Sequence, residues 1–279
     1  MGDRQGKSAE PRGTDAALVV GLMDGAAGFT AGAIAGVPVC PLELIKVRVE
    51  EGRTTVFELL RRQPRLTWVK HFGRAIPHFA MMFGSVCALE FSVNERVRAS
   101  YGASAGIAAS GMTGAVFLAA ADQRMLLRNS AMPVRVPWTR VSTGFTPMTA
   151  REACWIIGVM YLGPWAGAQL RQRGAFKGDE EWCNYAGRIA AGVPMAFVSH
   201  PFDVLTREMQ IQLRRGETPS WAGAARSVVA GAPVTLPRLL HGFYRGVLPR
   251  MGLASFGGAT AGAIYERVRP QLPGAPTAP

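Results

Sequence analysis

The sequence predicts an all-α membrane protein whose six membrane-spanning helices form three tandem helix pairs. Hydrophobic residues make up 48% of the 279 residues and charged residues only 18%, less charge than soluble domains usually carry. Six apolar segments approach the length that a bilayer requires. A proline-acid signature returns at a regular interval, and such a period indicates a repeat architecture.

The repeat begins with a proline followed by an acid at the end of an apolar segment. Residues 41–43 read Pro-Leu-Glu, residues 201–203 read Pro-Phe-Asp, and residues 120–122 are a worn copy, Ala-Ala-Asp. The acids therefore stand roughly 80 residues apart both times, and a fixed internal period indicates repeated units. The endings at 94–98 and 265–269 both contain Glu-Arg-Val-Arg, which supports the repeat independently.

The predicted spans are rich in Gly, Ala and Ser. They cover residues 16–40, 79–93, 102–121, 147–170, 185–198 and 249–264. Gly28, Gly32 and Gly36 fall on one helical stripe, where small residues let two backbones approach closely. Charges such as Asp24 and Arg188 inside the spans must face protein or an aqueous cavity. The alternative is a soluble Gly/Ala-rich helical protein; the repeat and the span lengths favour a membrane bundle.

The period divides the membrane part into three units, flanked by two tails. The boundaries are a polar N-terminal tail at 1–15, units at 16–100, 101–172 and 173–270, and a C-terminal tail at 271–279. The N-terminal tail mixes acids and bases, so we expect no cleavable presequence.

Local signals refine these units. Pro41 is expected to kink or end the first helix, because proline removes a backbone donor. Short surface helices are predicted over residues 54–60 and from Ser220, a plausible N-cap. Residues 71–77 are expected to lead back into the membrane. The middle unit has only about fourteen residues between Asn129 and Gly144, too few and too proline-broken for a surface helix.

Charge and composition exclude several functions. The net charge of +12 lies largely between and after the spans, where it favours anionic lipid headgroups. Without a nucleic-acid-binding module, we expect no nucleic-acid partner. The four cysteines and four histidines are dispersed, so we expect free thiols, no metal, no cofactor and no enzymatic activity.

These features together resemble the mitochondrial carrier family, over residues 16–270. The first unit carries the family's complete acid-base signature, whereas in the third unit Thr206 and Glu208 replace both bases. The residues at matching positions of this matrix-gate signature are Pro41, Glu43, Lys46, Arg48, Asp122, Pro201, Asp203 and Gln210. The resemblance implies a pseudo-threefold, multi-pass bundle in the mitochondrial inner membrane, with its short surface helices on the matrix side.

The resemblance also implies a ring of ion pairs in which each base binds the acid of the next unit. Lys46 would then pair with Asp122, while Asp203 and Glu43 would lack their bases. An unpaired buried acid is costly. Either other cations reach these acids, or water stays in that end of the bundle; the candidate cations are Arg124, Arg128 and Arg207.

Three further sets of residues are carried over from the family. The remnant of a cytoplasmic gate comprises Glu95, Arg98, Tyr265, Glu266 and Arg269. The fourth helix offers no acid to this gate, so the ring is not expected to close as in a working carrier. The positions of substrate contact are Met82, Arg151, Glu152 and Ala254, although Arg151 and Glu152 could simply satisfy each other. Cardiolipin is expected at Tyr244, Arg245 and Gly246.

Two functions follow from this pattern. Because the losses fall on gating residues while the packing glycines persist, we favour a structural or accessory subunit of a respiratory or ATP synthase complex, with transport lost or reduced. The alternative is an active solute transporter working by alternating access, with an unknown substrate. The bilayer, cardiolipin and, in the first case, other subunits are the expected partners.

Overall fold

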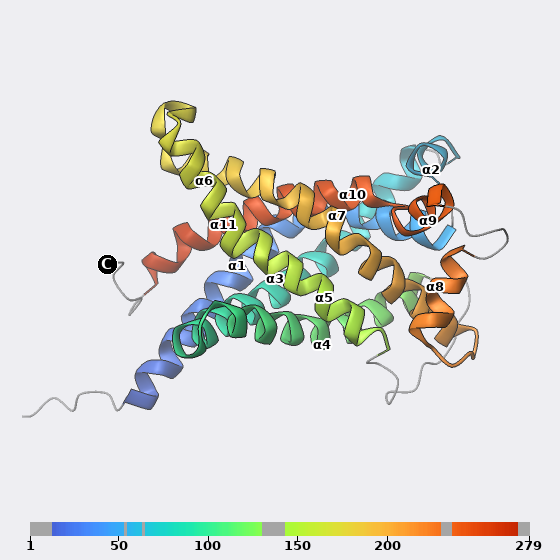
Figure 1. Ribbon diagram of the computed structural model, residues 1–279, viewed down its shortest axis with the longest axis horizontal. Coiled ribbons are helices and arrows are strands. Elements are labelled where there is room, and N and C mark those ends of the chain that lie inside the picture. The colour runs from blue at the N-terminus through green and yellow to red at the C-terminus, as the bar shows by residue number, and fades with distance from the viewer. Residues whose placement is uncertain (1–12, 53–54, 63–64, 130–142, 230–235, 273–279) are drawn as a thin grey trace, which may run out of the picture.

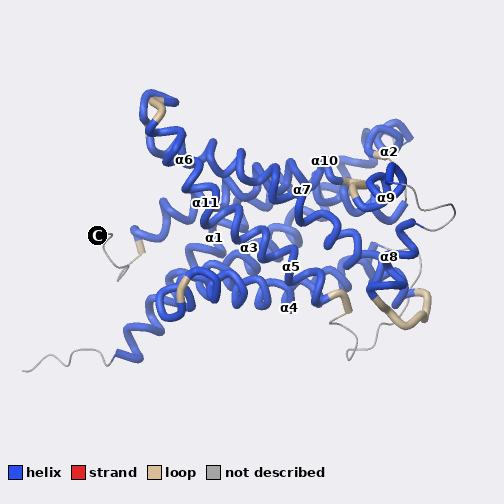
Figure 2. Tube along the Cα trace, viewed as in Figure 1, coloured by secondary structure: helices blue, strands red, loops and turns tan. Residues whose placement is uncertain are grey.

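The protein is helical throughout the residues that the structure describes. The computed structural model describes residues 13–52, 55–62, 65–129, 143–229 and 236–272, and Figure 2 shows helices joined by short loops. Among the described residues, four helices are long and apolar enough to cross a membrane; they are α1 (Gly13–Gly52), α3 (Arg65–Tyr101), α4 (Ala103–Asn129) and α7 (Glu180–Arg214). The predicted all-α fold with several membrane-span-like helices is confirmed.

Two further rods are continuous helices that contain a π-helical turn. The first joins α5 (Phe145–Ile156), η2 (Ile157–Leu162) and α6 (Gly163–Gln172), and the second joins α10 (Val247–Gly252), η4 (Leu253–Gly257) and α11 (Gly258–Val268). The residues at their junctions keep helical backbone angles. Both rods lie beside α7 in Figure 1. They coincide with the predicted fourth and sixth spans, whose crossing of the membrane stays a prediction.

Short helices gather at one end of the bundle. Figure 1 places α2 (Val56–Arg62), α8 (Trp221–Val229) and α9 (Leu236–Phe243) there, opposite the end at which α11 finishes. At that opposite end, η3 (Ala175–Gly178) connects α6 to α7, and η5 (Arg269–Gln271) follows α11. The Ser220 hydroxyl accepts a hydrogen bond from the Gly223 N–H at 3.0 Å, so the predicted cap is confirmed. The connection at 130–142 in the middle unit lies outside the described residues.

The prolines do not end their helices, contrary to one of the two expectations for Pro41. Helix α1 runs through Pro38 and Pro41, and α7 runs through Pro194 and Pro201. Likewise α3 passes through residues 71–77 without a break. Membrane helices tolerate proline because neighbouring groups compensate the freed carbonyls. Each signature therefore stays on a single continuous helix.

The predicted glycine stripe of α1 packs directly on α3. A Cβ atom at Gly28 would lie 2.6 Å from the carbonyl oxygen of Cys87, and one at Gly32 would lie 2.6 Å from that of Phe83. At Gly36 it would lie 3.0 Å from the Ala80 Cα. Only glycine permits this approach of two backbones, so the stripe is confirmed as a packing face.

A duplicated turn begins α5 and α10. Gly144 and Gly246 both have φ 85° and ψ 7°, a left-handed conformation that favours glycine. Each is followed three residues later by proline. Gly144 lies against Thr206, and Gly246 lies against Lys46 and Glu50. Thr206 and Lys46 occupy the same place in the predicted signatures, so the two turns match in backbone conformation and in packing.

The contact between α1 and α3 yields a first prediction. Gly28→Ala should lower the melting temperature in detergent by several degrees, because overpacking usually costs about 1–3 kcal/mol. Gly25→Ala is the matched control, since a Cβ at Gly25 meets nothing within 4 Å. Thermal unfolding followed by tryptophan fluorescence would measure both. Equal melting temperatures for the two variants would contradict the packing argument.

Candidate functional site

A buried charge cluster centres on Asp203 of α7. Its Oδ2 lies 2.8 Å from the Nζ of Lys46 on α1, and its Oδ1 lies 2.7 Å from the Nη1 of Arg151 on α5. The Nε of Arg250 on α10 is 3.7 Å from Oδ2. All four side chains are buried. One carboxylate thus connects α7 to three other helical segments.

This cluster shows which cations pair with Asp203 and Glu43, the two acids that lack their expected bases. Asp203 takes two arginines from the rods, and Glu43 shares Lys46 at 3.0 Å. The expected partner of Lys46, Asp122, has a side chain outside the described residues, so that pair stays a prediction. Within the described part of the chain, Lys46 pairs with Asp203 and Glu43. Arg124 and Arg128, the other suggested cations, also lie outside the described side chains.

Arg151 and Glu152 satisfy each other only in part. The Arg151 Nε donates a hydrogen bond to Glu152, but its Nη1 binds Asp203. Both residues are buried in this cluster. The two predicted substrate-contact residues of α5 are therefore parts of an ion-pair network. Glu90 of α3, which the sequence did not single out, is fully buried beside Glu152 and lies against Gly114.

A second layer of ion pairs explains two departures from the signature. The Oε2 of Glu50 lies 3.6 Å from the Nε of Arg207, and the Oε1 of Glu208 lies 3.6 Å from the Nη2 of Arg245. Ser227 also donates a hydrogen bond to Glu208 at 2.9 Å. Acids at positions where the family has a glutamine or a base are thus matched by arginines. Arg207 pairs with Glu50, whereas it was suggested as a partner for Asp203 or Glu43.

The predicted lipid site includes an arginine that pairs with a buried acid. Arg245 pairs with Glu208, its carbonyl oxygen lies 2.8 Å from the Nε2 of His200, and Tyr244 stacks on Phe197. The Arg245 guanidinium therefore lies beside the buried acid Glu208. Cardiolipin at Tyr244, Arg245 and Gly246 stays a prediction.

A separate network of ion pairs and hydrogen bonds joins the helices at the opposite end of the bundle. The Nε of Arg269 donates to Asp24 at 2.7 Å, and the hydroxyl of Tyr265 lies 3.4 Å from the same oxygen. Glu95 lies 2.9 Å from Arg98 and 3.7 Å from Arg269. The predicted remnant therefore contributes four of its residues here, and Asp24 supplies an acid that was not assigned to the gate.

Two details of that end differ from expectation. Glu266, predicted to belong to the gate, forms an ion pair with Arg188 of α7. The fourth span has no acid at this level, but Tyr161 donates a hydrogen bond to Asn94 at 3.0 Å. A hydrogen bond thus joins α3 to η2 at the place where an ion pair was expected to be missing.

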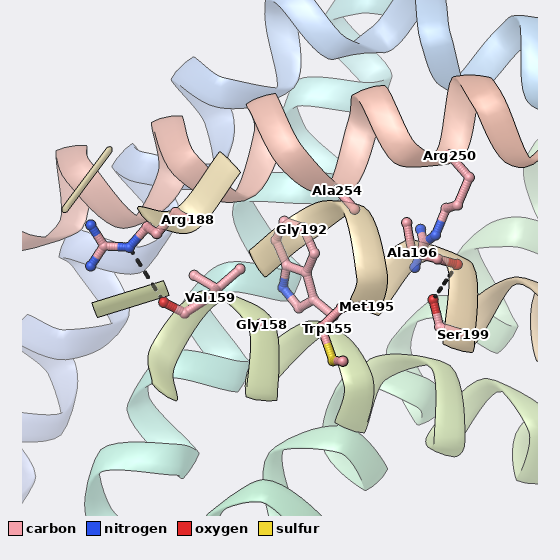
Figure 3. A pocket seen from close by; sticks show the side chains of 10 residues that line it. All are labelled: Trp155, Gly158, Val159, Arg188, Gly192, Met195, Ala196, Ser199, Arg250 and Ala254. Carbon is pink, nitrogen blue, oxygen red and sulfur yellow. Dashed lines mark hydrogen bonds between the residues drawn. The ribbon is translucent and has the colours of Figure 1, made fainter. Parts of the chain in front are cut away.

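A small cavity lies between the two networks. Figure 3 shows its lining, which includes Trp155, Met195 and Ala254, with Arg188 and Arg250 towards its two ends. Its volume is about 10 Å³, room for roughly one water molecule. Ala254 is the predicted substrate-contact residue that lines it, while Met82 packs against the apolar core.

The remaining signature residues lie on the same two helices. Arg48 is half-buried on α1, and Gln210 is buried on α7, where its side-chain oxygen accepts a hydrogen bond from Arg207 at 3.3 Å.

Compared with models of known protein families and with curated proteins, the chain matches none. Membership of the carrier family therefore stays a prediction from the motifs.

The Asp203 cluster yields a second prediction. Asp203→Ala leaves three buried cations facing one another, and breaking a buried pair costs about 3–5 kcal/mol. We expect a large fall in melting temperature in detergent. Glu181→Ala is the control, because its pair with Arg267 is exposed and such pairs contribute about 1 kcal/mol or less. Similar losses for both variants would show that Asp203 does not organise the bundle.

Proposed function

We propose that this chain is a carrier-like, multi-pass protein of the mitochondrial inner membrane, built from three pairs of spanning helices. Its bundle serves as a structural accessory subunit of a larger respiratory or ATP synthase complex, with transport lost or reduced. The observation that carries this proposal is that ion pairs tie both ends of the bundle at once, while the cavity between them holds about one water molecule.

The two ends are far enough apart to act as separate closures. Asp24 and Lys46 lie on the same helix, and 22 residues of helix rise about 33 Å. That distance is close to the thickness of the hydrocarbon core of a bilayer. A solute crossing the bundle would have to pass both networks.

Opening the Asp203 end is energetically demanding. The carboxylate would have to leave Lys46, Arg151 and Arg250, which come from three segments. Each buried charge that loses its partner is costly. Alternating access needs two states of comparable free energy, whereas these contacts favour one closed arrangement.

The outer faces offer area for lipid or neighbouring subunits. Large apolar side chains are exposed on several helices; they include Phe57, Val69, Met81, Val116, Trp165 and Phe256. Exposed apolar surface of this extent marks membrane or protein contact. An accessory subunit could therefore bind its neighbours through these outer faces, without a separate binding cleft.

Active transport is the second candidate function, and one observation favours it. The ion pairs at both ends use residues at the predicted gate positions, Lys46 and Asp203 at one end and Arg269 and Glu95 at the other. Ion pairs that exchange partners could form a gate. A substrate that supplied charge at Asp203 would reduce the cost of opening.

Two measurements on the full chain separate the functions. The accessory role predicts co-migration with an inner-membrane complex on native gels, and no exchange of metabolites by reconstituted liposomes. Metabolite exchange that is lost in Lys46→Ala but kept in Lys70→Ala would establish the transporter instead. Lys70 is the matched control because it is an exposed lysine on α3.

A further inference from the structure

Three buried side chains with metal-binding atoms converge beside the Asp203 cluster. Glu50, His200 and Asp203 each offer one ligand atom, and these atoms lie within 4.8 Å of one another. The side chains belong to residues that are only 2%, 0% and 2% exposed. The group is therefore enclosed by protein.

The helices bring these residues together in a way that the sequence spacing hides. His200 and Asp203 are three residues apart on α7, so they project from one face, a turn apart. Glu50 comes from α1. Metal sites within helix bundles combine a Glu and a His three residues apart, in the order Glu-x-x-His, with acids from facing helices. Here the same spacing occurs in the reverse order, with His200 before Asp203.

The hydrogen bond of His200 fixes which nitrogen is free. Its Nε2 lies 2.8 Å from the carbonyl oxygen of Arg245. A carbonyl can only accept, so Nε2 carries the hydrogen, and Nδ1 has no hydrogen-bond partner among the described residues. Histidines that bind metals commonly donate their other nitrogen to a backbone carbonyl in this way.

The carboxylates of Glu50 and Asp203 have lone pairs that could bind a metal ion. Neither carboxylate oxygen of Glu50 has a hydrogen bond within the described part of the chain, although Arg207 stands 3.6 Å from Oε2. Asp203 is bound by Lys46 and Arg151, one on each oxygen, and each oxygen has two lone pairs. Buried acceptors without donors are costly, and a cation between them would relieve that cost.

We propose that Glu50, Asp203 and Nδ1 of His200 form a binding site for a divalent transition-metal ion of the Zn²⁺ class. Nitrogen and carboxylate ligands suit this ion. Tetrahedral bonds of about 2 Å place ligands about 3.4 Å apart, so the three side chains must draw together slightly. The metal links α1 to α7 and competes with Lys46 for Asp203. This site is independent of whether the bundle transports a solute.

Zinc binding to the chelator-stripped, purified full chain in detergent tests the site directly. Calorimetry with ZnCl₂ should show one equivalent bound, and Zn²⁺ should raise the melting temperature. His200→Ala and the isosteric Glu50→Gln should each weaken binding at least tenfold. His241→Ala is the matched control, since this histidine is exposed on α9, and its affinity should equal that of the parent.

Lys46→Gln tests the competition. Removing the ammonium from Asp203 should tighten Zn²⁺ binding by about tenfold, whereas a general disruption of the cluster would weaken it. Bound Co²⁺ should give a visible spectrum that changes in His200→Ala, which reports a nitrogen ligand. The proposal fails if the parent binds no Zn²⁺, or if both His200→Ala and Glu50→Gln bind as the parent does. Unchanged or weaker binding by Lys46→Gln overturns the competition.

Discussion

The structure depends on how the carboxylate of Asp203 is neutralised inside the bundle. A buried charge must be paired, and Asp203 meets this requirement with Lys46, Arg151 and Arg250 from three segments of the chain. The cations in turn need the acids Glu43 and Glu152. Because each member compensates another, the positions of α1, α5, α7 and α10 are coupled through electrostatics as well as through packing.

Small residues make this electrostatic arrangement possible. The glycine stripe of α1 lets α3 approach backbone to backbone, and Gly187 of α7 allows the same against Gly163 and Gly167 of α6. Ion pairs held between closely packed helices interact more strongly than exposed ones, because the surroundings have a low dielectric constant. The same closeness makes opening costly, since both packing and charge pairs would be lost together.

The sequence predicted features that depend on neighbours along the chain. The all-helical class, the glycine stripe and the Ser220 cap follow from spacing and propensity. The pairing of charges did not follow, because it depends on which helices meet: Arg250 and Asp24 reach their partners only through contacts between distant segments. Pro41 was also ambiguous, since the tolerance of a helix for proline is set by its surroundings.

Two residues that depart from the expected signature, Glu50 and Glu208, show that charge balance is kept at this end of the bundle. Glu50 and Glu208 place acids where the resemblance leads one to expect a glutamine and a base, yet Arg207 and Arg245 face them. Charge balance at this end is therefore kept even though the signature positions are not. A gate built as an ordered ring needs its ion pairs in one fixed order, whereas stability requires only that buried charges have partners. Around Asp203 the paired charges come from α1, α5, α7 and α10. Separating them would leave buried charges without their partners, which agrees better with a bundle that stays closed than with one that alternates.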